Sequence, residues 1–499
     1  IMVSLGLLPV PPKCPLRARI SDRWDGAGYT CEKVFFESLP GFYVTGNLYR
    51  PAGESRRRRH PAVLAAHGHW PEGRLHDRDP VYSAMLTNMQ LARMGFVVFS
   101  YDMVGYNDSC QIGHARWPGN TWAFAADPAG GLSLMALQTW NSIRALDFLE
   151  SLPDVDARRM GVTGASGGGT QSFILAAVDR RVAACAPLAM VSHTMQGGCA
   201  CEGAPFLRVE SGNVEITALC APRPLFLSGC TGDWTTALLQ CEAPAIRAVY
   251  RLYGAEERVR AVMASGDHGC PKEIREAVYG FFNQALLGAE SADPVSEQSG
   301  MLRPPLPARM VWWGRPAPEP MQGDELRALW QARTAKALAP YRRSAARTRK
   351  ELGPLLAHLL AMTPQSRAAA RETEPIGIRC RVVGNVLHVD ATGEDAEAES
   401  EHFSVYNRTL ESRRVHEILG AADRLGGAVS LVGHGPAGFW CLLAAALDAR
   451  RICAVRASAP GRSRTERLPA FRQIGGMDTL RACLSDRWLN VDNCGDGGV

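Results

Sequence analysis

The sequence predicts an α/β protein in which a mostly parallel sheet is covered by helices on both faces. Short apolar runs without polar alternation recur along the first 290 residues, as is typical of strands that are buried on both sides. Segments with apolar residues at three- and four-residue spacing separate these runs, so strands and helices alternate. In sheets of this kind, functional sites lie at the carboxyl ends of the strands.

The elements can be placed along the chain from the N-terminus. Two antiparallel strands, at residues 30–36 and 42–49, are joined through Leu39-Pro40-Gly41 and precede the parallel part. The apolar runs that follow predict strands at residues 62–67, 96–101, 160–164, 182–186, 224–228 and 259–264. The helical spacing predicts helices at residues 82–94, 136–146, 171–178, 243–253 and 274–287.

Length and composition limit the classes of function. The 499 residues suggest two or more domains, and 46% apolar with 21% charged residues is ordinary for a globular protein. No stretch is apolar for long enough to span a membrane, and residues 1–10 lack the charged region and cleavage site of a signal peptide. The net charge is +5, and the one dense basic run, residues 56–59, is interpreted as a solvated turn, so no nucleic-acid partner is expected. Oligomeric state is left open.

The segment Gly164-Ala165-Ser166-Gly167-Gly168 lies between a predicted strand and a predicted helix. G-x-S-x-G in this setting predicts the nucleophile elbow of an α/β-hydrolase, a sharp turn that lifts Ser166 above the sheet. The glycines are expected because a Cβ beside this turn would clash. The same residues are similar to the glycine-rich turn of short-chain dehydrogenases, but the Tyr-x-x-x-Lys pair of such enzymes is absent downstream. A purely structural Gly-Ser turn is a third interpretation.

A nucleophilic serine needs a base, usually a histidine that a carboxylate orients. In this fold the chain order is serine, then acid, then histidine. Asp233 is the first carboxylate after Ser166 that comes just past a strand end, and His268 follows the next strand on a glycine-flanked loop. The sequence therefore predicts Ser166 as nucleophile, Asp233 as acid and His268 as base. Asp267 is the second candidate acid, but it adjoins His268 and cannot easily reach around to Nδ1.

An oxyanion hole requires two backbone N–H donors, which are expected from Gly167 and from His69 in the loop after an early strand. His67 and His69 also suggest a metal site, but no third ligand is near them in the sequence, so no metal and no cofactor is expected.

Four side chains are candidate substrate contacts. Aromatic rings on loops at the active end suit sugar rings, although such loops can equally pack on a neighbouring domain. These candidates are Trp70, Tyr106 and Trp234, together with Glu202 in a Cys-x-Cys loop that follows a strand.

The composition divides the chain into three regions. Residues 1–290 form the catalytic domain with its N-terminal β extension, and residues 291–375 form a linker and an Arg-rich helical segment interpreted as a solvated hairpin. Residues 376–499 hold a weak internal repeat, in which a strand and then a helix flank His434-Gly435-Pro436-Ala437-Gly438. Gly435 stands where the serine would be, so this region is expected to be a degenerate hydrolase-like α/β half-domain without nucleophile or base. A nucleotide site at these glycines is the alternative.

Several of these motifs together resemble a known family, the large bacterial acetyl-xylan-esterase-like α/β-hydrolases, which are related to dienelactone hydrolases and to the prolyl-oligopeptidase fold. The motifs are His67-Gly68-His69-Trp70, Tyr101-Asp102-Met103-Val104-Gly105, Gly164-Ala165-Ser166-Gly167-Gly168, Ala221-Pro222-Arg223-Pro224, Gly232-Asp233-Trp234 and His268. The likeness covers about the first 290 residues, and Ser166, Asp233 and His268 match the triad of that family.

The resemblance implies hydrolysis of carboxylic esters, often deacetylation of plant polysaccharides, and frequently a secreted or periplasmic location. The expected function is therefore a serine esterase that acts through an acyl-enzyme on xylan-type or similar small-acyl esters. The alternatives are a prolyl-oligopeptidase-like peptidase, a dienelactone-type hydrolase and a non-catalytic carbohydrate-binding protein.

Overall fold

The computed structural model describes residues 1–53, 59–114, 127–360, 378–392, 408–458, 468–484 and 488–492. Most of the basic run at residues 56–59 and the end of the predicted helical region at 361–375 lie outside the described residues. In the described part of the chain, none of the helices combines the length and the hydropathy that a membrane crossing requires.

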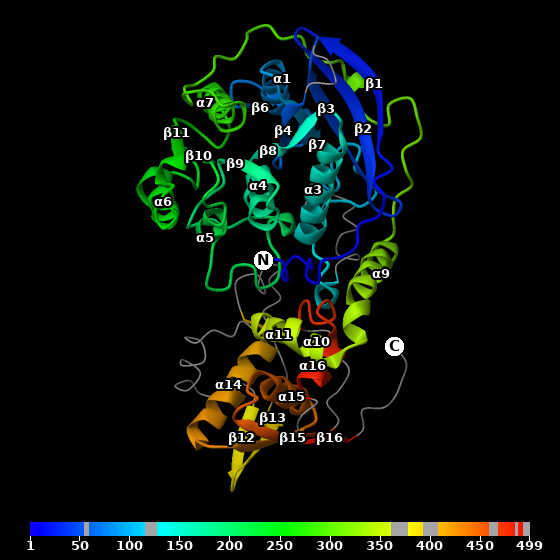
Figure 1. Cartoon of the computed structure of the whole chain (residues 1–499), viewed down its shortest axis with the longest axis vertical. Coiled ribbons are helices and arrows are strands. Elements are labelled where there is room, and N and C mark those ends of the chain that lie inside the picture. Colours follow the sequence, from blue (N-terminus) through cyan, green and yellow to red (C-terminus); the bar gives the residue numbers. More distant parts are fainter. Residues whose placement is uncertain are drawn as a thin grey trace.

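A nine-stranded sheet forms the larger body of the molecule (Figure 1). Its strands, in spatial order, are β1 (Arg19–Gly26), β2 (Tyr29–Leu39), β3 (Phe42–Pro51), β7 (Val97–Tyr101), β4 (His60–Ala66), β8 (Val155–Ala165), β9 (Val182–Leu188), β10 (Leu225–Cys230) and β11 (Val259–Ala264). The first three strands are antiparallel, β3 pairs antiparallel with β7, and β7 to β11 are parallel. A short hairpin of β5 (Asp77–Arg78) and β6 (Tyr82–Ser83) stands apart.

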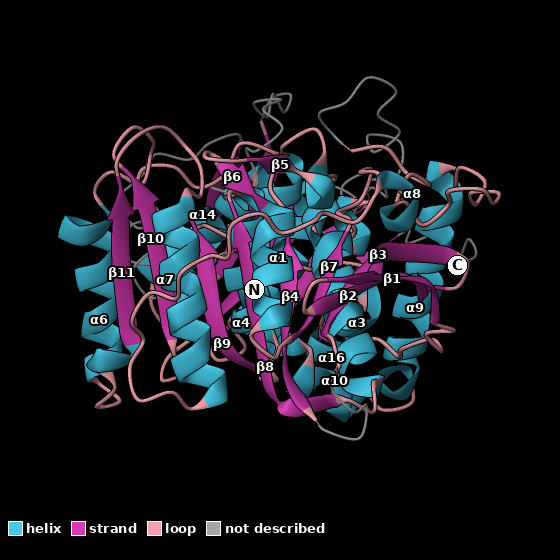
Figure 2. Ribbon diagram, turned by 90° about the horizontal axis from the view of Figure 1, so that it is seen from above, coloured by secondary structure: helices cyan, strands magenta, loops and turns pink. Residues whose placement is uncertain are grey.

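Helices cover both faces of this sheet, as the buried apolar strands predict. The helices are α1 (Ala84–Arg93), α3 (Leu134–Ser151), α4 (Gly167–Val178), α5 (Asn213–Ala218), α6 (Ala243–Arg251) and α7 (Lys272–Phe282). Side chains of α1 and α7 share one hydrophobic core with the sheet, and those of α3, α4 and α6 share the other. Figure 2, which looks down on the sheet, shows α1 and α7 lying across its near face. This architecture is that of an α/β-hydrolase.

The helix starts follow from the sequence. Ser83 Oγ accepts a hydrogen bond from the Leu86 N–H at 3.0 Å, and Ser133 Oγ accepts one from the Ala136 N–H at 3.1 Å. Each serine thereby caps a helix whose first N–H groups have no partner within the helix. The strand β4 is buried along its whole length. The carboxyl ends of β4, β8, β10 and β11 are thus held at one rim of a rigid sheet.

The Arg-rich segment is not the solvated hairpin that its composition suggested. It forms α8 (Leu306–Arg309), α9 (Gly323–Arg342), α10 (Ala345–Glu351) and α11 (Gly353–Leu359). Trp330 of α9 is fully buried, and the Arg333 guanidinium lies 3.5 Å from the centre of the Trp330 ring and 4.6 Å from that of Trp140. Arg333 also donates to the Gly6 carbonyl at 2.9 Å. The planar guanidinium stacks on indoles, so an arginine can be buried in the core.

A second sheet of five strands lies at the other end of the molecule (Figure 1). Its strands are β12 (Ile378–Val383), β13 (Val386–Ala391), β14 (Val429–His434), β15 (Ile452–Ser458) and β16 (Trp488–Asp492), and its helices are α14 (Leu410–Leu425), α15 (Ala437–Leu447) and α16 (Gly476–Leu484). β12 runs antiparallel to β13 and the other pairs are parallel. Buried and less buried residues alternate along β14, so in the described residues only one face is packed. A hydrolase sheet is covered on two faces.

Candidate active site

The turn at Ser166 has the strained geometry of an elbow. Ser166 adopts φ +58° and ψ −124°, a backbone conformation that a serine rarely takes. A Cβ added at Gly164 or at Gly168 would lie 2.4 Å from the carbonyl oxygen of Ala66, on the neighbouring strand β4. Both positions therefore require glycine, because the strand, the turn and the helix pass too close for any side chain.

The Asp233 carboxylate and the His268 ring are paired, and they lie on the loops that follow β10 and β11. His268 Nδ1 lies 2.7 Å from Asp233 Oδ2, and since a carboxylate only accepts, Nδ1 carries the hydrogen. The Thr235 N–H donates to Asp233 Oδ1 at 2.6 Å, and the Thr235 hydroxyl donates to the same oxygen. Burial raises the pKa of Asp233, but the hydrogen bonds from His268 and Thr235 outweigh it and hold that pKa below its usual value. Of the two candidate acids, Asp233 is the one bonded to His268.

Two tryptophans enclose the His268 ring. The Trp70 ring is stacked on it, with centroids 5.8 Å apart and planes within 5°, and the Trp234 centroid is 4.3 Å away at 37°. His268 Nε2 is buried and has no hydrogen-bond partner among the described residues. Ser166 and His268 are thus not bonded to each other in this structure, and a catalytic bond of this kind often tightens only when substrate is bound.

The loop that holds Gly68 and Trp70 contacts both Ser166 and His268. A Cβ added at Gly68 would lie 2.4 Å from a ring carbon of Trp70 and 2.9 Å from Ser166 Cβ. Since the same Trp70 ring stacks on His268, one indole lies beside both residues. The structure therefore brings Ser166, Asp233 and His268 to the same rim of the sheet.

The turn at Gly167, one of the two predicted oxyanion donors, lies against the side chain of His69. Gly167 is the first residue of α4, so its N–H has no acceptor within the helix, and the positive end of the helix dipole points at Ser166. A Cβ added at Gly167 would lie 2.6 Å from Cε1 of His69, which places the His69 loop against the turn.

The other predicted contacts divide into two pairs. Trp70 and Trp234 are partly exposed beside His268, where a ligand could reach them. Tyr106 is buried, with its ring edge-on to His67 and His114. Glu202 is also buried, and its carboxylate accepts hydrogen bonds from the Gly198 N–H at 2.9 Å and from the Thr170 hydroxyl. Tyr106 and Glu202 therefore stabilise loops and are not placed to contact substrate.

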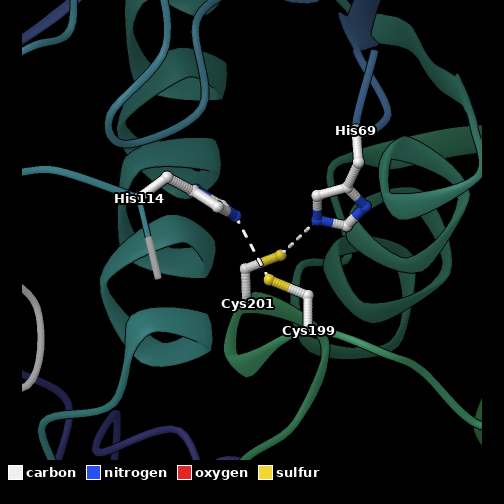
Figure 3. Close-up of side chains that lie close together, drawn as sticks. All are labelled: His69, His114, Cys199 and Cys201. Atoms are coloured by element: carbon white, nitrogen blue, oxygen red, sulfur yellow. Dashed lines mark hydrogen bonds between the residues drawn. The ribbon is translucent and has the colours of Figure 1, made fainter. Parts of the chain in front are cut away.

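The two early histidines point in different directions. His67 Nε2 accepts from the Met103 N–H at 3.0 Å and Nδ1 donates to the Gly68 carbonyl at 2.8 Å, while burial lowers the pKa of His67 to about 3, so the ring is neutral. His69 instead turns toward three residues from distant parts of the chain, His114, Cys199 and Cys201 (Figure 3). The expectation that no third ligand lies near His69 is therefore wrong. Apart from the Cys-x-Cys spacing, the group has no signal in the sequence, because folding brings its members together from distant positions.

A buried ion network stabilises the loops behind the site. Arg74 is almost fully buried, and its guanidinium donates to the Asp102 and Asp108 carboxylates and, at 3.0 Å, to the Asn47 side chain. Charges buried this deeply need paired partners, so removing one would leave the other uncompensated. Arg74 was not singled out from the sequence, although its acidic partner Asp102 belongs to the Tyr101–Gly105 motif.

The chain is similar in sequence to one family model and to two curated proteins. Residues 23–192 match the model of the acetyl xylan esterase (AXE1) family. The Bacillus subtilis protein YtaP, whose name places it among hydrolases, is 27% identical over an alignment of 246 residues, and the match covers 45% of this chain and 79% of YtaP. The Neurospora crassa 4-O-methyl-glucuronoyl methylesterase is 25% identical over 211 residues, but the match spans only 52% of that protein.

The fold is also shared with a solved structure. The methylesterase BT1017 superposes with a TM-score of 0.55 at 27% identity, over 69% of this chain and 74% of that protein. The family match covers β2 to β9, including the serine turn, and the structural match extends well beyond it. The chain is therefore a hydrolytic enzyme with the α/β-hydrolase fold, and it is similar to acetyl xylan esterases and methylesterases over the matched part.

Proposed function

We propose that the chain is a serine esterase in which Ser166, His268 and Asp233 form the catalytic triad, and that it removes small acyl groups, such as acetyl, from carbohydrates of the xylan type. The observation that carries the proposal is the paired Asp233–His268 dyad on the rim where Ser166 stands in a strained elbow, with one indole beside both. The acetyl xylan esterase match supports the substrate class.

Each group then has one chemical task. Ser166 Oγ attacks the ester carbonyl while His268 Nε2 accepts its proton, and Asp233 holds the imidazolium through Nδ1. The N–H groups of Gly167 and His69 bind the oxyanion, and His268 returns the proton to the departing alcohol. Water next attacks the acyl-enzyme by the same steps in reverse, which releases the acid and the free serine.

The two indoles around the base suit a sugar ring. Trp70 and Trp234 exclude water from the His268 faces, and their partly exposed edges offer apolar surface on which the apolar face of a pyranose can pack. Because His268 Nε2 has no hydrogen-bond partner in the described part of the chain, its hydrogen-bonding capacity is left for Ser166 and the substrate.

Replacing the nucleophile tests the proposal. Ser166→Ala should lower kcat/KM for p-nitrophenyl acetate and for acetylated xylo-oligosaccharides by at least about 10⁴-fold, because the residual rate comes only from the oxyanion donors and binding. Labelling by a fluorophosphonate probe should be lost as well. Ser151→Ala, at the exposed end of α3, is the matched control and should leave both unchanged. Full turnover by the Ser166→Ala protein would refute the assignment.

A second candidate substrate is a methyl ester of a uronic acid, since both BT1017 and the Neurospora protein are named as methylesterases. The two classes place the sugar differently: it is the alcohol in an acetylated xylan and the acyl group in a methyl uronate. A panel of acetylated xylo-oligosaccharides, methyl uronates and peptides decides between them and the peptidase alternative, with acetate, methanol or amine as the measured product.

We also propose that residues 376–499 are a degenerate copy of the hydrolase fold. The support is local: Gly435 follows β14, precedes α15 and adopts φ +55°, close to the φ of Ser166. The partly parallel five-stranded sheet is consistent with such an origin, whereas its single packed face is a departure from it.

A further inference from the structure

Four metal-binding side chains converge beside the proposed oxyanion loop. His69 comes from the loop after β4, His114 from the loop after β7, and Cys199 and Cys201 from the segment after β9. Their ligand atoms all lie within 4.8 Å of one another, and it is the one group of three or more such residues in the described part of the chain. Figure 3 shows the two imidazoles facing the two sulfurs from opposite sides.

The orientation of these groups is set by their surroundings. His69 Nε2 lies 2.9 Å from Cys201 Sγ, and His114 Nε2 lies 3.2 Å from Cys199 Sγ. His114 Nδ1 is 2.8 Å from the Val104 carbonyl, which can only accept, so Nδ1 carries the hydrogen and the Nε2 lone pair faces the sulfurs. A backbone carbonyl on the far nitrogen is a common partner of a metal-bound histidine.

Burial separates this group from an accidental surface cluster. Cys199, Cys201 and His114 are at most 3% exposed, and His69 is partly buried. The rest of the loop is also fixed, since Glu202 accepts from the Gly198 N–H and Gln171 donates to the Cys201 carbonyl. The segment that carries the two cysteines is therefore held by contacts that do not involve their thiols.

We propose that His69, His114, Cys199 and Cys201 bind one Zn²⁺ ion. Two imidazoles and two thiolates are a donor set that zinc prefers, and tetrahedral coordination needs ligand atoms about 3.5 Å apart, which small side-chain rotations of this group provide. The ion would displace the thiol proton of each cysteine, so binding to the two thiols releases two protons.

The proposed zinc site would have a structural role and would take no part in the reaction. All four coordination positions are filled by the protein, so none is open for substrate, as in structural zinc sites. His69 Cε1 packs against Gly167, so the ion would fix the loop of one oxyanion donor relative to the other. This consequence rests on the proposed triad mechanism, whereas zinc binding itself does not.

The metal content of the purified full chain tests the proposal. Wild-type protein, prepared with a thiol reductant and without chelator, should contain about one zinc per chain by elemental analysis. After extraction, Co²⁺ should bind in its place and give a thiolate-to-cobalt charge-transfer band. Cys201→Ala and His114→Ala should each lose the zinc and the band. Cys241→Ala, which removes an exposed cysteine outside the group, should keep both.

Measurements of ester turnover and zinc content together distinguish a failure of the zinc proposal from a failure of the triad proposal. Ser166→Ala should retain its zinc, whereas zinc removal should lower ester turnover by up to about 10²-fold, the effect of losing one oxyanion donor, and added zinc should restore it. Circular dichroism shows whether each variant has folded, and Cys199→Ser provides a milder change where Cys201→Ala does not fold. The proposal is wrong if folded wild-type protein takes up neither Zn²⁺ nor Co²⁺, or if mass spectrometry of the reduced preparation shows a Cys199–Cys201 disulfide.

Discussion

At the scale of single residues, Thr235 controls the acid of the proposed triad. It donates both its N–H and its hydroxyl to Asp233 Oδ1, and the Cys230 N–H in turn donates to the Thr235 hydroxyl at 2.9 Å. Asp233 is therefore held from one side by Thr235 and from the other by His268. Because these bonds favour the charged form, Asp233 stays ionised where a buried carboxyl alone would become neutral.

Thr235→Val should therefore slow the esterase without greatly changing substrate binding. Losing a hydrogen bond to a charged group raises the pKa of Asp233 and loosens its hold on His268, so kcat should fall about tenfold at neutral pH with a similar KM. Asp233 must be ionised, so the acid limb of the kcat/KM profile should move to higher pH. Thr235→Ser keeps the hydroxyl and is the control. A pH–rate profile that is the same in Thr235→Val and wild type would show that Thr235 has no part in orienting the acid.

At the scale of elements, the strand–turn–helix of β8 and α4 depends on backbone contact with β4. The Ser166 N–H also donates to the Leu188 carbonyl of β9 at 2.9 Å, so the turn is held from both sides. The Cβ of any residue at 168 would lie 2.4 Å from the Ala66 oxygen, and neither strand can move within a paired sheet. Ser166, the proposed nucleophile, thus owes its position to Gly168.

Gly168→Ala should damage the site although it leaves Ser166 in place. Overpacking against backbone costs about 1–3 kcal/mol and displaces the turn, so the midpoint of thermal unfolding and the rate of fluorophosphonate labelling should both fall. Gly353→Ala at the start of α11 is the control, since its Cβ would lie 2.9 Å from a side-chain atom, the Cys483 sulfur, and not from backbone, so both values should fall much less. Normal labelling of the Gly168→Ala protein would mean that the turn tolerates the added carbon.

The sequence predicted the elements of the first sheet well because parallel buried strands are continuously apolar. The predicted strand at residues 259–264 has the same first and last residues as β11. The predicted ends of β4, β7, β9 and β10 lie within about two residues of the observed ends. The edge strand β1 was missed because its residues are mostly exposed and polar. α9 was found as a helix but wrongly placed in solvent, because an arginine stacked between Trp140 and Trp330 looks like any other arginine in a sequence.

In the candidate site too, residues that belong to sequence motifs were predicted, and residues that only folding brings together were not. Ser166, Asp233 and His268 were proposed from motif and chain order, which follow the strand ends of a familiar topology. The zinc-type group could not be proposed in that way, since His114 is 85 residues from Cys199 and His69 is 132 residues from Cys201. The Cys-x-Cys spacing was the one local signal. That His69 and His114 lie beside these cysteines follows only from the three-dimensional structure.

At the scale of the whole molecule, the two sheets are joined through the N-terminal residues. Val3 packs in the core of the second sheet, whereas Leu5 and Leu7 pack in a core of the first. Polar contacts cross the same junction: Thr334 donates to Gln473 at 2.8 Å, and Arg472 pairs with Asp127. A segment that contributes to both cores couples their stabilities, so we expect the described body to unfold as one cooperative unit.

His358 of α11 lies in this junction and should make its stability depend on pH. His358 Nε2 is 3.4 Å from Ser4 Oγ, and burial lowers the pKa of His358 from 6.5 to about 4. Between these values the unfolded chain binds a proton that the folded chain does not. The contribution of neutral His358 to the free energy of unfolding is therefore complete above pH 6.5. It is lost as the pH falls toward 4, at about 1.4 kcal/mol per pH unit.

Denaturant unfolding of wild type and His358→Phe at several values between pH 7.5 and 4.5 measures this term, because all other titrating groups are common to both proteins. The free energy of unfolding of wild type should decline more steeply with acid than that of the variant, and the difference should vanish above pH 6.5 apart from a constant offset. Parallel curves would mean that the imidazole is protonated as easily in the folded protein as in the unfolded chain. In that case water would reach the His358 ring in α11. The N-terminal segment would then couple the two sheets only through the packing of Val3, Leu5 and Leu7.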